Sequence, residues 1–177
     1  KNGQTLHNHY HGHKIEVGDL VLVDGGIEIE SGYCGDITRT TPASGIFTPE
    51  QQEIYDLVHL MYKEGVKEAR AGKLYLDVHL HTAKVLVDGL KNIGLMKGDT
   101  ESAVKEGAHA MFFQHGLGHV MGLDVHDMEN FGEQHIGYSD TLQKSTQFGL
   151  KSLRLGKELE VGNVITIEPG IYFIPEL

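Results

Sequence analysis

The chain has 177 residues, of which 40% are hydrophobic and 23% are charged, so it is long enough to bury one substantial core. Its formal net charge of −10 argues against binding to nucleic acid, because contact with a phosphate backbone needs a basic surface. The single cysteine, Cys34, excludes an internal disulfide and fits a reducing, cytoplasmic compartment, and no apolar stretch is long enough to cross a membrane.

Two extended runs in the first part of the chain predict a β-hairpin. Leu20–Ile29 is mostly apolar, Tyr33–Thr41 is rich in threonine, and Ser31-Gly32 between them has turn chemistry. Residues 1–14 are polar and histidine-rich without a clear period. We interpret most of the histidines there as part of a mobile polar tract or as a chance of composition.

Helices are predicted in the middle of the chain. Thr48-Pro49-Glu50-Gln51 offers an N-cap, a proline at the first helical position and a capping-box glutamine, and Gly72 is a natural stop. The apolar stripe of this helix comprises Ile54, Leu57, Val58, Met61 and Ala69. A second helix is predicted over residues 76–93 and a short one near residues 100–107.

The last third of the chain predicts little regular structure until its end. Residues 112–155 are dotted with glycine and are predicted to be mostly loop. Residues 164–168 and 171–174, on either side of Pro169-Gly170, are predicted to be strands. Strands at both ends with helices between them indicate an α+β fold.

A short repeat connects the two ends of the chain. Residues 16–26, EVGDLVLVDGG, recur as residues 160–170, EVGNVITIEPG, with Asp24 aligned on Glu168. The strand keeps its apolar character except where Leu22 becomes Thr166. We infer two related halves in a pseudo-twofold arrangement, each delivering acidic side chains to a shared centre.

Asp24 and Asp36 lie symmetrically about residue 30, close to the predicted turn. A hairpin centred there would place them opposite each other, with Cβ atoms ~4.5–5.5 Å apart. A pair of divalent metal ions would offset the repulsion, since such pairs need bridging carboxylates. Alternatively, they are turn-flanking aspartates on a solvated hairpin, or a bulge breaks the register. The counterpart of Asp36 in the second half would fall near position 180, so we expect this sequence to lack one ligand of the intact protein.

The stretch HGLGHVMGLDVHD, residues 115–127, holds three histidines and two acids among glycines and apolar residues. Buried histidines need partners, which a metal ion or a hydrogen-bonded substrate would supply. His115 and His119 are four residues apart, but Gly116 and Gly118 argue against a zinc-protease helix, and the H-E-x-x-H pattern is missing. A loop that offers one metal ligand and other donors is favoured, with a structural histidine loop as the alternative.

Taken in order, several motifs resemble those of the proline-specific metallopeptidases, aminopeptidase P and prolidase, which have the pita-bread fold. The motifs are LVLVDGG, GDITRT, FTPEQQEIYDLV, HGLGHVMGLDVHD and TIEPGIY. The resemblance runs from about Leu6 to the end of the chain. It implies that residues 1–177 are a catalytic-domain fragment, truncated at both ends and without the family's N-terminal domain.

The resemblance also implies a set of site residues. The ligands of a dinuclear metal site would be Asp24, Asp36, His119 and Glu168. The family's fifth ligand, a glutamate, lies outside this chain. His7 matches a histidine on the substrate side, and His115 and His126 match those that assist near the scissile bond.

The implied activity is hydrolysis of the bond between the first residue and proline in a peptide or dipeptide. The oxygen-rich ligand set suits Mn²⁺, with Co²⁺ or Zn²⁺ as substitutes. A metal-bridged hydroxide would attack, Glu168 would shuttle the proton, and His126 and His115 would stabilise the developing charge. We expect the intact protein to be a homodimer and the isolated fragment to be inactive, with weak or absent metal binding.

Rival functions share the same fold. Methionine aminopeptidase is one, but HGLGHVMGLDVHD looks more like the proline-peptidase version. Creatinase and metal-free binding modules lack the acidic ligand set, whereas each ligand position inside this chain is filled, which favours a hydrolase. Residues 128–160 form a longer segment than in the best-known bacterial members, and no role is assigned to it.

Overall fold

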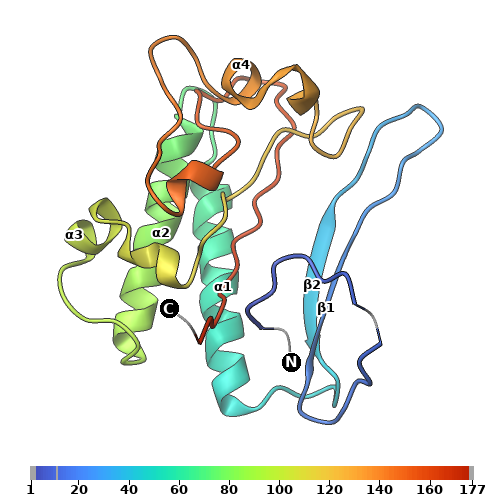
Figure 1. Cartoon of the computed structure of the whole chain (residues 1–177), viewed down its shortest axis with the longest axis vertical. Helices are drawn as coiled ribbons and strands as arrows, with labels where there is room; N and C mark the ends of the chain where they lie inside the picture. Colours follow the sequence, from blue (N-terminus) through green and yellow to red (C-terminus); the bar gives the residue numbers. More distant parts are fainter. Residues whose placement is uncertain (1–2, 11, 176–177) are drawn as a thin grey trace.

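In the computed structural model, which describes residues 3–10 and 12–175, the predicted hairpin is present (Figure 1). β1 (Leu20–Gly25) pairs antiparallel with β2 (Ile37–Pro42). The chain reverses through a three-residue loop, in which Gly32 adopts a left-handed φ of 85° and its N–H donates to the Ile29 carbonyl at 2.8 Å. Glycine takes this conformation without a steric penalty, which is why the turn forms there.

The register of the hairpin differs from the prediction. Asp24 is paired with Thr38, not with Asp36, because the loop is centred on residue 31 rather than on residue 30. The prediction that the two aspartates face each other is therefore wrong. They occupy diagonal positions on one face of the ladder, where side chains are about 7–8 Å apart.

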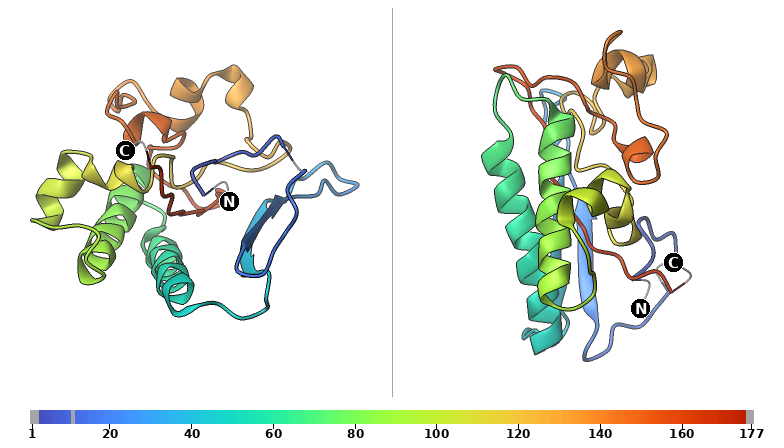
Figure 2. Two further views of the ribbon diagram at one scale, coloured as in Figure 1. Left: turned by 60° about the horizontal axis from the view of Figure 1, so that its bottom comes forward. Right: turned by 90° about the vertical axis from the view of Figure 1, so that its left-hand side faces the viewer.

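The two long helices begin where the sequence predicts and pack side by side (Figures 1 and 2). α1 (Pro49–Glu68) has the predicted capping box, in which the Thr48 hydroxyl accepts from the Gln51 N–H at 3.2 Å. α1 ends before Gly72, since Ala69 is already extended. α2 (Tyr75–Asn92) approaches α1 closely, because an added Cβ on Gly89 would lie 2.2 Å from a methyl group of Leu57.

The middle of the chain also follows the prediction. α3 (Thr100–Lys105) is capped by Asp99 and is followed by the 3₁₀ turn η1 (Ala108–Met111). The predicted loop region holds only short elements, which are η2 (Glu129–Phe131), α4 (Glu133–Gly137) and η3 (Leu150–Ser152). None of the helices in the described part of the chain has the length and apolar character needed to cross a bilayer.

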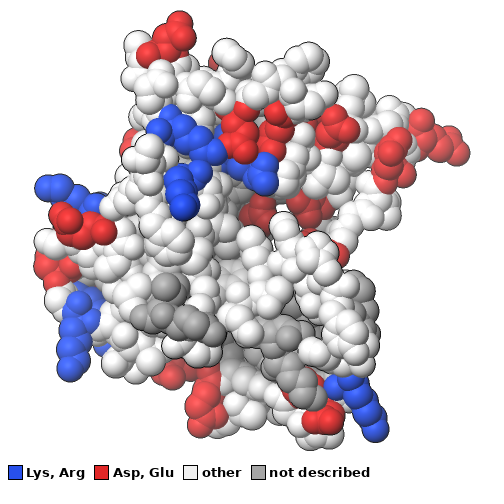
Figure 3. All heavy atoms as spheres, viewed as in Figure 1, with Lys and Arg blue, Asp and Glu red and all other residues white. Residues whose placement is uncertain are grey.

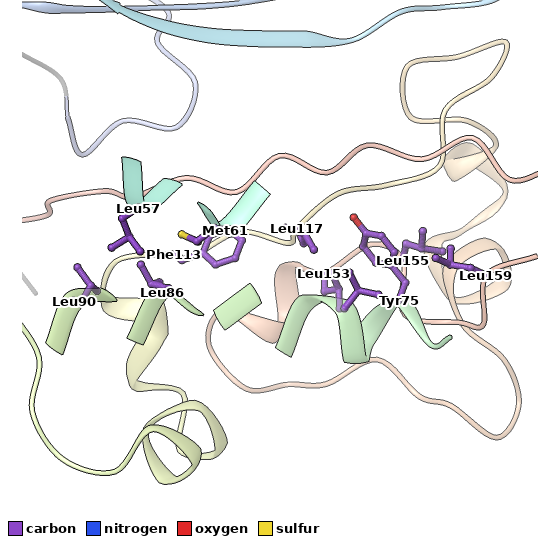
Figure 4. Close-up of a cluster of buried hydrophobic side chains, with 11 residues drawn as sticks. Leu57, Met61, Tyr75, Leu86, Leu90, Phe113, Leu117, Leu153, Leu155 and Leu159 are labelled. Carbon is purple, nitrogen blue, oxygen red and sulfur yellow. The ribbon is translucent and has the colours of Figure 1, made fainter. Parts of the chain in front are cut away.

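The hydrophobic core lies between the two long helices and the irregular second half of the chain (Figure 4). Its buried members are Leu57, Met61, Tyr75, Val78, Leu86, Leu90, Phe113, Leu117, Leu153, Leu155 and Leu159. The last three leucines come from the 128–160 segment. The last part of that segment therefore packs into the core, while Met128, Phe131 and Phe148 in its earlier part are exposed.

The two strands predicted near the end of the chain do not form as regular strands. Residues 164–168 are extended and are held to residues 117–121 through the isolated bridge between Val120 and Ile165. The ladder is interrupted because the Thr166 carbonyl accepts from the Tyr75 hydroxyl at 2.7 Å. This C-terminal segment runs between the hairpin and the helices (Figure 2).

Candidate metal centre

His119 is the most buried of the predicted metal ligands, with 3% of its surface exposed. Its main chain is bonded to the extended segment 164–168. Its Nδ1 lies 2.9 Å from the Val120 carbonyl oxygen, which only accepts hydrogen bonds, so Nδ1 carries a proton. The other ring nitrogen, Nε2, is left to face the acidic groups.

Three potential ligand atoms from distant parts of the chain meet at this point. The Nε2 atom of His119 lies 3.4 Å from Asp36 Oδ2 and 3.2 Å from Glu168 Oε1. All three atoms lie within 4.8 Å of one another. Two carboxylates and one imidazole form a donor set that suits a divalent cation, and the tautomer of His119 offers Nε2 as a ligand. These residues therefore fit a metal site.

The ionisable groups that meet at this point influence one another's pKa values. Burial raises the pKa of Asp36, and the negative charges of Glu168 and Asp24 raise it further. Burial is the largest single influence on both partners and would raise the pKa of Glu168 and lower that of His119, but their mutual hydrogen bond, further hydrogen bonds to Thr166 and Val120 and the opposite charges together shift both in the opposite direction. A bound cation would offset the same crowding of negative charge.

Asp24 lies at the edge of this cluster and is not one of the three converging residues. Its side chain is exposed at the end of β1 and accepts a hydrogen bond from the Thr38 hydroxyl at 2.8 Å. Its charge still raises the pKa of Asp36 and contributes to the raised pKa of Tyr172. Asp24 is therefore on the same side of the site but outside the group that could hold one ion.

His126 stacks beside His119, with their ring centroids 4.0 Å apart. Its Nδ1 lies 3.4 Å from a carboxylate oxygen of Glu129, which also pairs with Arg154. Burial lowers the pKa of His126, and positive charge on His119 and Arg154 lowers it further. Glu129 and Arg154 were not expected from the sequence, although the spacing of three residues from His126 to Glu129 was a visible signal.

His115 occupies an aromatic pocket next to Glu168. Its ring meets those of Phe113 and Tyr172 edge-on, with centroids 4.8 and 5.4 Å away. Its Nδ1 lies 2.8 Å from the Gly116 carbonyl oxygen, and its buried Nε2 has no hydrogen-bond partner among the described residues. Burial lowers the pKa of His115 and raises that of Tyr172 to about 12. Tyr172 is a third site residue that sequence reasoning missed, after Glu129 and Arg154.

His7 lies on the same side of the molecule as His115. It is exposed, and a positive charge on it would lower the pKa of His115. Its neighbours His9 and His13 are exposed as well, and His13 meets the Tyr10 ring edge-on at 4.9 Å. His11 lies outside the described residues.

Acidic side chains gather on the face that carries the hairpin tip and residues 124–133 (Figure 3). They include Glu28, Asp124 and Asp127. Partial burial, and then these three charges, raise the pKa of Cys34, whereas Glu129 and Glu133 pair with Arg154 and Lys144. An excess of acidic side chains attracts cations.

A profile of metallopeptidase family M24 matches residues 1–177. The chain belongs to this family. It is 38% identical over 176 residues to the Xaa-Pro aminopeptidase of Escherichia coli (strain K12), and 39% identical over 173 residues to a probable Xaa-Pro aminopeptidase of Metarhizium robertsii. These alignments cover 99% and 98% of the chain but 35% of each relative, so the chain spans about a third of their length.

Solved structures give the same result for the fold. The chain matches a zinc-substituted E. coli aminopeptidase P in complex with product at a TM-score of 0.80 and 38% identity, over 99% of the chain and 35% of that structure. It matches the aminopeptidase PepP of Pseudomonas aeruginosa at a TM-score of 0.80 and 34% identity, with the same coverage. The predicted family and pita-bread fold are confirmed.

Proposed function

We propose that this chain is part of a metal-dependent hydrolase that cleaves the bond between an N-terminal residue and proline. The observation that carries the proposal is the meeting of Asp36, His119 and Glu168 around one point in a metallopeptidase chain. Relatives named Xaa-Pro aminopeptidases support the choice of substrate, and one E. coli aminopeptidase P structure contains the inhibitor Pro-Leu. The acidic set disfavours the metal-free binding module and the creatinase-like alternative.

The three converging residues would hold one ion, and Asp24 would supply a ligand for a second. Two carboxylates beside one histidine favour Mn²⁺, with Co²⁺ or Zn²⁺ as substitutes. When bound, divalent ions would lower the pKa of a water molecule towards neutrality and polarise the scissile carbonyl.

Glu168 is the residue best placed to move a proton. Its Oε1 lies 3.2 Å from His119 Nε2, while its side chain keeps 37% of its surface exposed. We assign it the transfer of a proton from the attacking water to the departing proline nitrogen. Like any amide nitrogen, this nitrogen must gain a proton to leave as an amine.

His126 and His115 would contact the substrate in different ways. Glu129 lies beside Nδ1 of His126, so Nε2 is the atom that would face the scissile carbonyl. Because the pKa of this ring is lowered, it would donate there only when developing negative charge on the substrate oxygen favours the protonated ring, and that charge is what it would then stabilise. His115 has its proton on Nδ1 beside the Gly116 carbonyl oxygen, so its buried Nε2 would accept a hydrogen bond. A substrate N–H is the matching donor, so we propose this role for His115 in place of the charge stabilisation that the family resemblance implied, and His7 would lie on that side of the substrate.

The remaining expectations stay predictions. They are that the intact protein is a cytoplasmic homodimer, that residues 1–177 are part of its catalytic domain, and that this part alone is inactive.

The function can be tested by measuring hydrolysis of Xaa-Pro dipeptides and longer Xaa-Pro peptides by the metal-loaded, full-length protein. Asp36→Ala should abolish turnover, because it removes one of the three converging ligands. Asp140→Ala, the same change at an exposed loop position, is the matched control and should leave turnover unchanged. Normal turnover by Asp36→Ala would refute the site assignment.

A further inference from the structure

Thr166 is the one polar residue that interrupts the apolar strand of the repeat. The first copy has Leu22 at the same position. Thr166 is only 9% exposed, and it lies between the two predicted ligands His119 and Glu168. A threonine costs free energy when it is buried unless its hydroxyl is satisfied, so its contacts indicate why it is there.

Each polar group of Thr166 forms a hydrogen bond, either with one of the two predicted ligands or with Tyr75. Its N–H donates to the His119 carbonyl at 2.9 Å, and its carbonyl accepts from the Tyr75 hydroxyl at 2.7 Å. Its hydroxyl oxygen accepts from the His119 N–H at 2.9 Å. The same hydroxyl donates to Glu168 Oε1, also at 2.9 Å.

The direction of this chain of hydrogen bonds follows from the donors. A backbone N–H can only donate, so the threonine oxygen must accept from His119. The hydroxyl hydrogen is then free to point at the carboxylate, which can only accept. The carboxylate oxygen that receives it is the one that lies 3.2 Å from His119 Nε2. One hydroxyl thus ties the main chain of one predicted ligand to the side chain of the other.

We propose that Thr166 is a positioning residue that holds Glu168 and His119 in a metal-ready arrangement. The inference rests on the metal site proposed above, but it concerns a residue that binds neither metal nor substrate. Residues that orient metal ligands typically change metal affinity by about 10–100-fold when they are removed. Valine has nearly the shape of threonine but no hydroxyl, so it would leave the buried His119 N–H unpaired and would remove the hydroxyl that donates to Glu168 Oε1.

The test compares Thr166→Val and Thr166→Ser with Thr82→Val in the full-length protein. Thr82 is a matched control, because it is fully buried and its hydroxyl donates to the Val78 carbonyl of its own helix at 2.9 Å rather than to a predicted ligand. Three properties are measured: the Co²⁺ dissociation constant, the visible absorption of the Co²⁺ form, and kcat and KM separately.

Thr166→Val should weaken Co²⁺ binding about 10–100-fold, alter the Co²⁺ spectrum and lower kcat more than it raises KM. Thr166→Ser should restore the affinity to within about threefold, because it keeps the hydroxyl. Thr82→Val should lower thermal stability but leave the Co²⁺ constant and spectrum unchanged. Thr166→Ala replaces the valine variant if that protein does not fold, with the same expected loss.

The inference is overturned if Thr166→Val binds Co²⁺ like the wild type, or if Thr82→Val weakens binding as much as Thr166→Val does. Failure of the proposed function is a separate result. A wild-type protein that binds Co²⁺ without cleaving Xaa-Pro bonds refutes the substrate, and the affinity ratio between Thr166→Val and wild type still decides the positioning role. A wild-type protein that binds no Co²⁺ overturns both.

Discussion

The two copies of the repeat begin with the same local structure and end in different surroundings. In residues 16–19 and in residues 160–163, a side-chain oxygen of the fourth residue accepts from the first N–H at 2.9 Å, and the glycine has a φ of 97°. Beyond the turn, the first copy forms an edge of an exposed two-stranded hairpin. The second lies against the core and the 117–121 segment.

The acids at the ends of the two copies differ accordingly. Asp24 is exposed and accepts from Thr38 across the hairpin, whereas Glu168 is partly buried and accepts from Thr166 two residues earlier in its own segment. His119 adds a second contact on Glu168. A repeat therefore determines the turn and the position of an acid, but the tertiary neighbours determine how firmly that acid is held.

The largest expected effect comes from neutralising each acid in turn. Glu168→Gln should lower kcat on the order of 10²–10⁴-fold, because it removes the proposed proton carrier as well as a ligand charge. Asp24→Asn should remove one of two bound ions while the ion at the three converging residues stays. Metal content measured by mass spectrometry, together with kcat, distinguishes the two variants. Equal metal losses in both variants would contradict the distinction between the copies.

The free energy of unfolding should also depend on pH, through a histidine on the buried side of the molecule rather than in the exposed hairpin. His79 in α2 is fully buried between the rings of His109 and Phe113, and neither ring nitrogen has a partner among the described residues. Burial, and then positive charge on His109 and His115, lower the pKa of His79 to about 3. Below a pH of about 6.5 the unfolded chain binds a proton there that the folded chain does not. Stability should therefore fall as the pH drops from about 6.5 towards 3.

Between pH 7 and pH 5 this difference should amount to about 2 kcal/mol of unfolding free energy. His79→Phe should remove that part of the pH dependence in chemical denaturation, while His59→Phe, at an exposed helical position, should keep it. An unchanged pH slope in His79→Phe would show that the imidazole is not buried in its neutral form.

Local chemistry explains which parts of the fold could be predicted. The capping box at Thr48 and Gln51 involves residues three apart, so the start of α1 is present in the sequence itself. The turn at Gly32 is equally local, but the residue on which it is centred determines the register of the whole hairpin. Placing that centre one residue too early made Asp36, rather than Thr38, the predicted partner of Asp24. The strand predicted at residues 164–168 is interrupted by Tyr75, which lies far away in sequence and gives no local signal.

The candidate site also has parts that could be predicted from the sequence and parts that could not. The repeat indicated that the acids of the two ends share a centre, and the family resemblance added His119. The contact between Tyr172 and His115 depends on how two distant segments pack, which no spacing reveals. Thr166 was visible as the one polar break in the apolar repeat, but its meaning required the position of the His119 main chain.

The smallest expected effect concerns the hydroxyl that supports Asp24. Thr38→Val removes an exposed hydrogen bond, which contributes about 1 kcal/mol or less, so metal affinity should fall by no more than about fivefold. Comparing this variant with Thr166→Val shows the effect of losing a supporting hydroxyl beside the exposed acid, Asp24, and beside the partly buried acid, Glu168. A larger loss of Co²⁺ affinity in Thr38→Val than in Thr166→Val would contradict the expectation that the partly buried acid depends more on its hydroxyl partner.

The most direct test of the central claim is anomalous X-ray diffraction from crystals of the protein grown with Mn²⁺. The account predicts a manganese peak within about 2.0–2.3 Å of His119 Nε2 and in contact with carboxylate oxygens of Asp36 and Glu168. A crystal in which manganese binds elsewhere, or in which these three side chains point away from one another, would contradict it.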